Sequence, residues 1–327
     1  MKADVVTIGE SMVLFQPYTE GTINYTPLLS KSVGGAESNL AFGLSRLGKK
    51  VRWISRLGSD PFGDLILATL SGEGVDISYA KRDDNAPTAL YFKESKGYGD
   101  PNVFYYRKHS AASKLSSEDI EASWLDDARH LHMTGITPAL GENTADFTRE
   151  VMKRAREKGM TISFDPNLRR KLWSDEQARE VLLSLIPLCD IFLPGIEEAE
   201  FLLGEKTKEQ YGKSFLDMGA SVVAMKLGAE GSLGFFQDEV VNVAPYKVDK
   251  VIDTVGAGDA FAAGFLSRVL DEENPLAFYE MKHFLPEALK RANVMGALAT
   301  QFKGDWEGAP TLEEVSGLMG GKQMVTR

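Results

Sequence analysis

An alternation of strand and helix patterns across residues 130–226 constrains the fold of this chain most strongly. Short apolar runs that are typical of buried strands occur at 130–134, 161–165, 191–193 and 222–226. Helical patterns lie between and after them, at 143–158, 175–185, 197–203 and 208–218. Strands separated by helices are joined by crossover connections, which place them parallel in one sheet. The sequence therefore predicts an α/β fold with a mainly parallel central sheet covered by helices on both faces.

Further elements are expected on both sides of this region. Strand patterns lie at 5–8, 51–57 and 246–252, and a pair at 233–236 and 240–244 is expected to run antiparallel near one edge of the sheet. Helical patterns lie around 40–47, from 61 onward, at 260–270 and at 287–301. The last of these is expected to be the final long helix.

Two segments depart from the alternation of strands and helices. The runs 88–93 and 102–107 flank a Gly- and Pro-rich turn at 95–101, which is the pattern of a hairpin. Residues 12–33 have no clear period, and we expect β structure there that leaves the main body. The sequence thus predicts a single domain over 1–327 with a small β lid from roughly 12–33 and 88–108. The alternative is a hairpin that only decorates the surface.

Composition limits the partners and the compartment of such a domain. The formal net charge of −10 argues against nonspecific binding to nucleic acid or to an anionic membrane surface. Cys189 is the only cysteine and lies in an apolar run, so we expect a buried thiol that suits a reducing compartment. The N-terminus enters a strand without a signal-peptide pattern, which favours a cytoplasmic protein.

The stretch DTVGAGDAF at 253–261 carries the strongest chemical signal. Gly256 and Gly258 allow a sharp bend where a helix begins, and the N–H groups of a first helical turn favour an anion such as phosphate. Asp259 would repel bound phosphate, but a carboxylate there can deprotonate an attacking hydroxyl. This favours phosphoryl transfer. On spacing alone, a purely structural acid at the helix N-terminus remains an alternative.

Polar residues also follow three other predicted strands. Asp165 to Arg169 follow the strand at 161–164, Lys226 follows that at 222–225, and Glu10 follows the first strand. Ligands of open α/β sheets bind outside the carboxyl ends of the strands. We therefore expect these residues to lie near one site.

Two motifs together resemble those of the ribokinase-like (PfkB) carbohydrate kinases. DTVGAGDAFAAGF, from residue 253, is similar to the C-terminal signature of that family, and VGGAESNLAFGLSRLG at 33–48 is similar to its N-terminal glycine motif. The resemblance implies a ribokinase-like three-layer sandwich and in-line transfer from Mg-ATP to a sugar hydroxyl. Asp259 would be the general base. The N–H groups of Gly256, Ala257 and Gly258 would stabilise the charge on the transferred group.

The resemblance also implies a sugar site. Its residues would be Gly34, Gly35, Asn39, Tyr91, Tyr105, Arg107, Asn167, Arg169 and Asp259. The tyrosines and arginines are similar to the pattern of 2-keto-3-deoxygluconate kinases, which phosphorylate the C6 hydroxyl of a sugar acid. Guanidinium groups match carboxylates in geometry, so we expect Arg107 and Arg169 near the acid group. A fructokinase or ribokinase, and a non-catalytic sugar-acid sensor, remain alternatives.

For the nucleotide and the metal, the resemblance is less complete. Lys226, Gly228 and Gly231 resemble a turn beneath the adenosine, Asn293 lies in the region that resembles the adenine wall, and Gly256 and Gly258 would hold phosphate. The family pattern Asn-x-x-Glu has Gly195 in place of its Asn, so Glu198 is expected to contact Mg²⁺ through water. His130 and His132 are expected to serve packing or to lie on the surface rather than to bind a metal. A dinucleotide oxidoreductase is disfavoured because no G-x-G-x-x-G spacing occurs.

The predicted hairpin also suggests an assembly. Phe92, Phe104 and Tyr106 should share the face opposite Tyr91 and Tyr105, because alternate side chains of a strand point to opposite faces. A protruding apolar face is better covered by a partner. We therefore expect a homodimer or a higher homo-oligomer formed through the lid.

Overall fold

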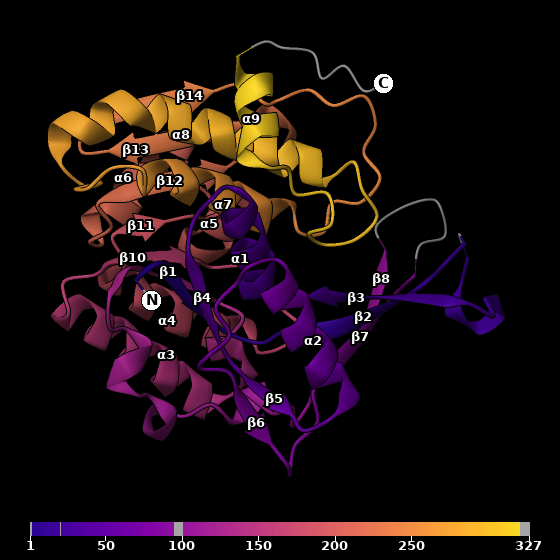
Figure 1. The fold of residues 1–327 in the computed structure, drawn as a ribbon. Helices are drawn as coiled ribbons and strands as arrows, with labels where there is room; N and C mark the ends of the chain where they lie inside the picture. The colour runs from indigo at the N-terminus through magenta and orange to yellow at the C-terminus, as the bar shows by residue number, and fades with distance from the viewer. Residues whose placement is uncertain (1, 20, 95–100, 321–327) are drawn as a thin grey trace.

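A central eight-stranded sheet organises the computed structural model, which describes residues 2–19, 21–94 and 101–320. Its spatial order is β14-β13-β12-β11-β10-β9-β1-β4 (Figure 1). The strands are β1 (Ala3–Ile8), β4 (Val51–Ile54), β9 (Ala128–Thr134), β10 (Thr161–Asp165), β11 (Ile191–Phe192), β12 (Val222–Lys226), β13 (Ser232–Phe236) and β14 (Glu239–Val243). All neighbouring strands from β12 to β4 pair in parallel, whereas β13 and β14 are antiparallel. The predicted sheet with its antiparallel edge pair is therefore confirmed.

Helices cover both faces of this sheet. The first face carries α3 (Glu142–Glu157), α4 (Asp175–Leu185), α5 (Ile196–Leu203) and α6 (Lys208–Asp217). The second carries α1 (Ala36–Arg46), α2 (Pro61–Gly72), α7 (Ala257–Val269) and α8 (Phe278–Ala299). Successive strand side chains enter opposite cores, since Val6 lies in the first core and Val5 in the second. The predicted three-layer α/β arrangement is therefore confirmed.

Two strand predictions are wrong. Residues 246–252 form no strand, because pairing with the sheet ends at Val243 and the N–H groups of Ile252 and Asp253 donate to the carbonyl oxygen of Thr300 instead. The pattern at 51–57 is divided between β4 and β5 (Arg56–Gly58), and β5 pairs with β6 (Lys81–Asp83) outside the central sheet.

The last helices also differ from the prediction. α8 begins at Phe278 rather than near residue 287, and it contains Pro286. Met281, Phe284 and Leu285 are fully buried in the core of the second face, and this burial offsets the local cost of a proline inside the helix. α9 (Leu312–Met319) follows and packs through Val315 beside α8. It was not predicted.

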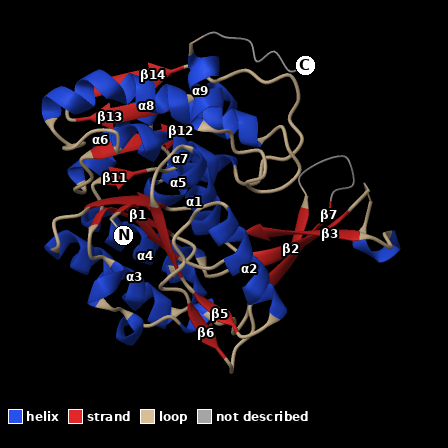
Figure 2. Cartoon of the chain, viewed as in Figure 1, coloured by secondary structure: helices blue, strands red, loops and turns tan. Residues whose placement is uncertain are grey.

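A second, four-stranded sheet projects from the body (Figures 1 and 2). We call it the lid sheet; its strands, in spatial order, are β3 (Leu29–Gly34), β2 (Met12–Pro17), β7 (Ala89–Glu94) and β8 (Asn102–Tyr106). β7 and β8 form the predicted hairpin, and β2 and β3 supply the expected β structure in residues 12–33. The predicted turn at 95–101 lies almost wholly outside the described residues. The parallel pairing of β2 with β7 joins the two segments into one sheet.

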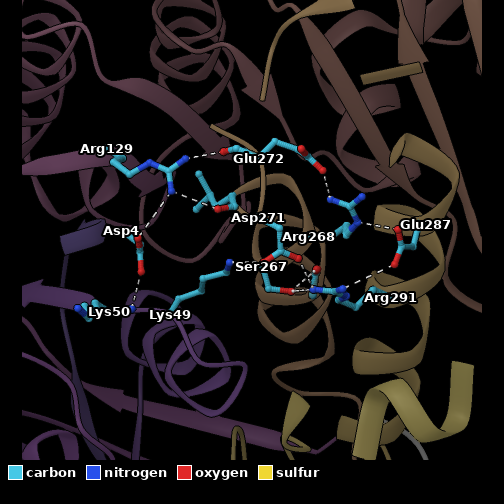
Figure 3. A network of polar contacts seen from close by, with 12 residues as sticks. Asp4, Lys49, Lys50, Arg129, Ser267, Arg268, Asp271, Glu272, Glu287 and Arg291 are labelled. Carbon is cyan, nitrogen blue, oxygen red and sulfur yellow. Dashed lines mark hydrogen bonds and ion pairs between the residues drawn. The ribbon is translucent and has the colours of Figure 1, made fainter. Parts of the chain in front are cut away.

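A network of charged residues fixes the C-terminal end of α7 (Figure 3). Arg129, at the start of β9, donates to the carbonyl oxygens of Leu270 and Glu272 just beyond the helix. Arg268 pairs with Glu272 and with Glu287 of α8 at 2.7 and 2.6 Å. Cations at this helix end satisfy carbonyl groups that lack partners within the helix. These contacts fix the C-terminal end of α7 relative to β9 and α8.

The remaining helices are short. Turns of 3-10 helix lie at Ile23–Tyr25, Ala112–Lys114, Ser117–Asp119, Ala122–Trp124, Pro138–Leu140, Ile186–Leu188 and Gly228–Glu230. None of the helices in the described part of the chain combines the length and the apolarity that a membrane crossing requires.

Candidate active site

A cavity of about 440 Å³ lies between the lid sheet and the body. The lid side contributes Met12, Tyr91, Lys93, Val103, Tyr105 and Arg107, and the body contributes Gly35, Asn39, Asn167, Arg169, Gly256, Gly258, Asp259 and Asp305. The cavity thus brings together every residue predicted for the sugar except Gly34. Gly34 still shapes it, because a Cβ there would lie 2.0 Å from the Tyr91 hydroxyl.

Asp259 is a buried carboxylate in the first turn of α7. Its Oδ2 accepts a hydrogen bond from Asn39 Nδ2 at 2.8 Å, and its Oδ1 accepts one from Asn167 Nδ2 at 3.1 Å. Burial raises the pKa of Asp259 to about 7, although the hydrogen bond from Asn39 acts in the opposite direction. The group is therefore oriented by two amides, and it changes protonation near neutral pH, as a general base requires.

The start of α7 has the sharp bend that the sequence predicts. Gly256 caps the helix with a φ of 82°, which is a left-handed conformation, and a Cβ there would lie 1.9 Å from the carbonyl oxygen of Asp305. A side chain at position 256 would push the start of α7 away from the segment that carries Asp305. The N–H group of Ala257 donates to the carbonyl oxygen of Thr254 at 3.3 Å, so it is partly engaged within the turn. The N–H groups of the first turn beyond Ala257 remain directed at the helix end.

A second cavity, of about 600 Å³, adjoins the first. It is lined mainly by apolar groups and by Gly228, Gly231, Val248, Val251, Phe261, Asn293, Gly296 and Ala297. Lys226, Thr254 and Gly258 line both cavities. Asn293 donates its amide to the carbonyl oxygens of Val243 and Ala244, so it holds the wall of this cavity in place. The segment 246–252, predicted as a strand, instead forms part of the wall.

Lys226 stands at the junction of the two cavities. Its Nζ lies 2.7 Å from Oδ2 of Asp165. Burial alone would lower the pKa of Lys226, yet the carboxylates of Asp165 and Glu198 raise it above its ordinary value. The group is therefore a fixed positive charge beside the start of α7.

The two predicted arginines are in different states. Arg107 is buried, and its Nη2 lies 2.5 Å from Oε2 of Glu10, whose other oxygen accepts from the Ser110 hydroxyl. Its guanidinium group also lies 5.4 Å from the ring centre of Tyr105. Arg169 is exposed, and its Nη1 donates a long hydrogen bond of 3.4 Å to the carbonyl oxygen of Leu168. Arg107 is thus already held by an acid, whereas Arg169 can turn toward a ligand.

The residues near Glu198 fit a magnesium ion only in an indirect way. Glu198 accepts hydrogen bonds from the N–H groups of Leu168 and Gly195, both at 2.7 Å. Gly195 caps α5, and its backbone alone makes this contact. Across residues 2–19, 21–94 and 101–320, no group of three His, Cys, Asp or Glu side chains converges as a metal site. This donor set fits a Mg²⁺ ion that is bound largely by phosphate oxygens and water.

His130 and His132 are buried in the sheet, as their packing interpretation predicts. Both share the hydroxyl of Ser163, at 2.7 and 2.8 Å, and His130 also contacts Thr161. Burial lowers the pKa of His130 to about 3, so the ring is neutral. Cys189 is buried as expected, and burial raises the pKa of its thiol.

Three residues of the site were missed in the sequence. Glu10 was noted only as a polar residue after a strand, whereas Lys93 and Asp305 were not singled out at all. Lys93 sits in a strand pattern and Asp305 in a loop beyond a helix, so neither position carries a local signal. Lys93 and Asp305 contact each other although they lie 212 positions apart in the chain.

A family model described as pfkB family carbohydrate kinase matches residues 2–312. The chain belongs to the pfkB family of carbohydrate kinases. The predicted family and its ribokinase-like α/β fold are therefore confirmed, and this pfkB kinase is 43% identical to the 2-dehydro-3-deoxygluconokinase of Bacillus subtilis (strain 168), over 99% of this chain and 98% of that one.

Two further proteins are similar to this pfkB kinase over nearly the whole chain. A probable fructokinase-4 of Arabidopsis thaliana is 31% identical over 98% of each chain. A sugar kinase from Pyrococcus horikoshii, solved in complex with ATP, superimposes with a TM-score of 0.80 at 31% identity, covering 95% of this chain and 96% of that one.

Proposed function

We propose that this pfkB kinase transfers the γ-phosphoryl group of ATP to the C6 hydroxyl of 2-dehydro-3-deoxygluconate, which is also called 2-keto-3-deoxygluconate. The products are 2-keto-3-deoxy-6-phosphogluconate and ADP. The observation that carries the proposal is that one cavity holds both a buried, amide-bound Asp259 and the guanidinium groups of Arg107 and Arg169. The identity of 43% with a 2-dehydro-3-deoxygluconokinase supports the same substrate.

Asp259 performs the proton transfer in this mechanism. Its carboxylate accepts the proton of the C6 hydroxyl while the hydroxyl oxygen bonds to the γ-phosphorus, and the bond from that phosphorus to the bridging oxygen breaks to release ADP. Asn39 and Asn167 orient the carboxylate through their hydrogen bonds. The N–H groups of Gly256, Ala257 and Gly258 stabilise charge on the transferred group, with the part-engaged Ala257 contributing least.

The apolar cavity is proposed as the site of the adenosine. Gly228, Gly231 and Asn293 line it, and Lys226 lies where it joins the sugar cavity, near the position of the phosphates. A lysine ammonium there attracts the phosphates of the nucleotide. Mg²⁺, when bound, neutralises phosphate charge, and Glu198 is the side chain that would hold it through water.

The sugar acid is proposed to bind under the lid sheet. Tyr91 and Tyr105 stack at a ring separation of 5.9 Å on the inner face and lie against the sugar. Arg169 contacts the carboxylate directly. Arg107 also lies near the carboxylate. Its ion pair with Glu10 orients the guanidinium group but lowers the net positive charge that it offers to the sugar acid.

The experiment that tests this function is a panel of substrates with ATP, in which release of ADP is measured. The panel contains 2-keto-3-deoxygluconate, fructose and ribose, and Asp259→Asn serves as the inactive control. We expect the highest kcat/KM for the sugar acid. A preference for a neutral sugar would favour a fructokinase or ribokinase, and binding without ADP release would favour a sensor.

We further propose that the enzyme is a homodimer formed through the outer face of the lid sheet, with the whole chain as one domain. Phe92 stacks with Phe15 and meets Tyr106 edge-on, while Phe104 and Tyr106 are 46% and 67% exposed. This apolar face is continuous across three strands, so a second copy that covers it would bury side chains of the same kind.

A further inference from the structure

A lysine of the lid sheet is buried between two carboxylates of the body. Nζ of Lys93 lies 2.5 Å from Oδ2 of Asp253 and 3.0 Å from Oδ1 of Asp305. The three side chains are only 4%, 7% and 6% exposed, respectively. Burial alone would lower the pKa of Lys93, but the carboxylates of Asp305 and Asp253 raise it above its ordinary value. The lysine is therefore charged, and it is the counterion of both acids.

Both carboxylates belong to the segments that build the anion site. Oδ1 of Asp253 accepts the N–H group of Val255 at 3.1 Å, which fixes the loop that enters α7. Asp305 packs directly on Gly256, whose missing Cβ would otherwise lie 1.9 Å from the Asp305 carbonyl oxygen. Lys93 therefore contacts both the loop that enters α7 and the segment of Asp305 that packs on Gly256. We call the place where these two segments meet the junction at Gly256, and the first turn of α7 starts there.

Tyr91 makes a second connection from the same strand face. It stands two residues before Lys93, and its hydroxyl donates to Oδ2 of Asp305 at 2.6 Å. The inner face of β7 thus holds Asp305 through both of its carboxylate oxygens. The contacts that Tyr91 and Lys93 make with Asp305 therefore hold the lid sheet against the body and also fix the segment that packs on Gly256.

We propose that Lys93 is a positioning residue that couples the lid sheet to the anion site. Its ammonium group holds loop 253–256 and Asp305 together, so that the N–H groups at the start of α7 face the phosphoryl group. Without this cation, two buried carboxylates would repel each other and the anionic substrates. The inference rests on the proposed phosphoryl transfer, and it adds that contacts of the lid sheet help to order the site for the phosphate.

The test compares Lys93→Met with Lys93→Arg, which keeps the charge. Lys31→Met, an exposed lysine on β3 of the same sheet, is the matched control. We expect Lys93→Met to lower kcat by roughly 10- to 100-fold, the range for a displaced catalytic geometry, with a smaller change in the KM of ATP. Lys93→Arg and Lys31→Met should stay within a few-fold of the wild type. Added ammonium chloride should partly restore Lys93→Met, compared with sodium chloride at equal ionic strength.

The possible outcomes separate this inference from the proposed function. A folded Lys93→Met enzyme with normal kcat, or an equal loss in folded Lys93→Met and Lys93→Arg without rescue, would overturn the positioning role while the kinase activity stands. If Lys93→Met does not fold, kcat of Asp253→Asn is the test, because this variant removes one of the two negative charges that Lys93 pairs with and keeps its ion pair with Asp305. A lowered kcat supports the inference and an unchanged kcat refutes it. A wild type that phosphorylates no sugar would refute the proposed function itself.

Discussion

If Asp259 is the general base, as proposed, its protonation should set the response of the enzyme to pH. Because burial raises its pKa to about 7, the carboxylate is ionised, and can accept a proton, only above neutral pH. We expect kcat/KM to rise with pH through about 7. Asp259→Asn should lower turnover by roughly 10² to 10⁴. Initial rates measured between about pH 5 and about pH 9 check both expectations, and a flat profile would remove Asp259 from the role of general base.

The same residue should limit the stability of the fold. The pKa of Asp259 is raised above its ordinary value of 3.8, so its contribution to stability is fully present below the unfolded pKa and is lost as the pH rises through about 7. At pH 8 the native state carries a buried, ionised carboxylate. Asp259→Asn should therefore raise the melting temperature at pH 8 and leave it nearly unchanged near pH 4.

The control for this stability prediction is Glu157→Gln, which makes the same change from carboxylate to amide on an exposed position of α3. Its melting temperature should follow the wild type at both pH values. An Asp259→Asn protein that is less stable at pH 8 would show that the hydrogen bonds from Asn39 and Asn167 outweigh the cost of burying the charge.

The two arginines of the sugar site should differ when each is replaced by alanine. A hydrogen bond to a charged group is worth roughly 1.5–3 kcal/mol, so Arg169→Ala should raise the KM of the sugar acid about ten-fold or more. Stability should hardly change, because Arg169 is exposed. Arg107→Ala should also destabilise the protein, because it leaves the buried Glu10 without its cation.

Arg170→Ala provides the control for the arginine series, since Arg170 is adjacent and exposed and faces Asp175. Its kinetic constants should equal those of the wild type. Chemical denaturation separates the loss of stability in Arg107→Ala from the loss of binding in Arg169→Ala. Normal binding of the acid by Arg169→Ala would contradict the carboxylate assignment.

At the scale of the element, α7 connects the fold to the chemistry. Its C-terminal end is fastened by Arg129 and by the ion pairs of Arg268 (Figure 3), and its N-terminal end is set by Gly256. A helix held at both ends presents its first-turn N–H groups in a fixed direction. Preorganised groups of this kind stabilise a transition state without rearranging during the reaction.

The two glycines of the motif should respond differently to alanine. At Gly256 the φ of 82° and the contact of 1.9 Å with the Asp305 backbone make a Cβ costly, by about 1–3 kcal/mol or more. At Gly258 a Cβ would meet only the flexible end of Lys226, at 3.7 Å. We expect Gly256→Ala to lose stability and activity together, whereas Gly258→Ala should remain stable and lose activity, because the methyl group occupies the junction of the two cavities.

Thermal unfolding and turnover of both variants test this difference. Gly72→Ala is the control, because it lies in α2, and a Cβ there would meet nothing within 4 Å. It should be neutral or slightly stabilising. Equal stability of Gly256→Ala and Gly258→Ala would mean that the junction with Asp305 can adjust.

At the scale of the whole molecule, the lid sheet is expected to serve both the site and the assembly. Its inner face lines the sugar cavity and its outer face carries exposed aromatic side chains. Light scattering should give twice the chain mass of 35.9 kDa. Tyr106→Asp should shift the mass toward the monomer, because it places a charge within an apolar contact. Phe302→Asp, at an exposed position outside the lid sheet, should not. A monomeric wild type would refute the dimer.

Local patterns in the sequence were sufficient to predict most helices and strands and to select most residues of the candidate site. Strand and helix periods depend on neighbouring residues, so the parallel sheet and the helices of residues 130–226 were predictable. The bend at Gly256 and the acid at Asp259 are likewise local features of one motif. The prediction of a strand at 246–252 is wrong because an apolar run forms a strand only where a neighbouring strand can pair with it. Here the N–H groups of Ile252 and Asp253 donate to the carbonyl oxygen of Thr300 instead.

Only the tertiary structure decided the electrostatics of the site. The pairs Glu10–Arg107 and Lys93–Asp305 join segments that are far apart in the chain, and no local period or spacing predicts such partners. Arg107 and Arg169 look alike in the sequence, yet one is neutralised by a buried acid and the other is exposed. The physical reason is that the energy of a charge depends on its burial and on its nearest counterion, which are set by packing between distant segments.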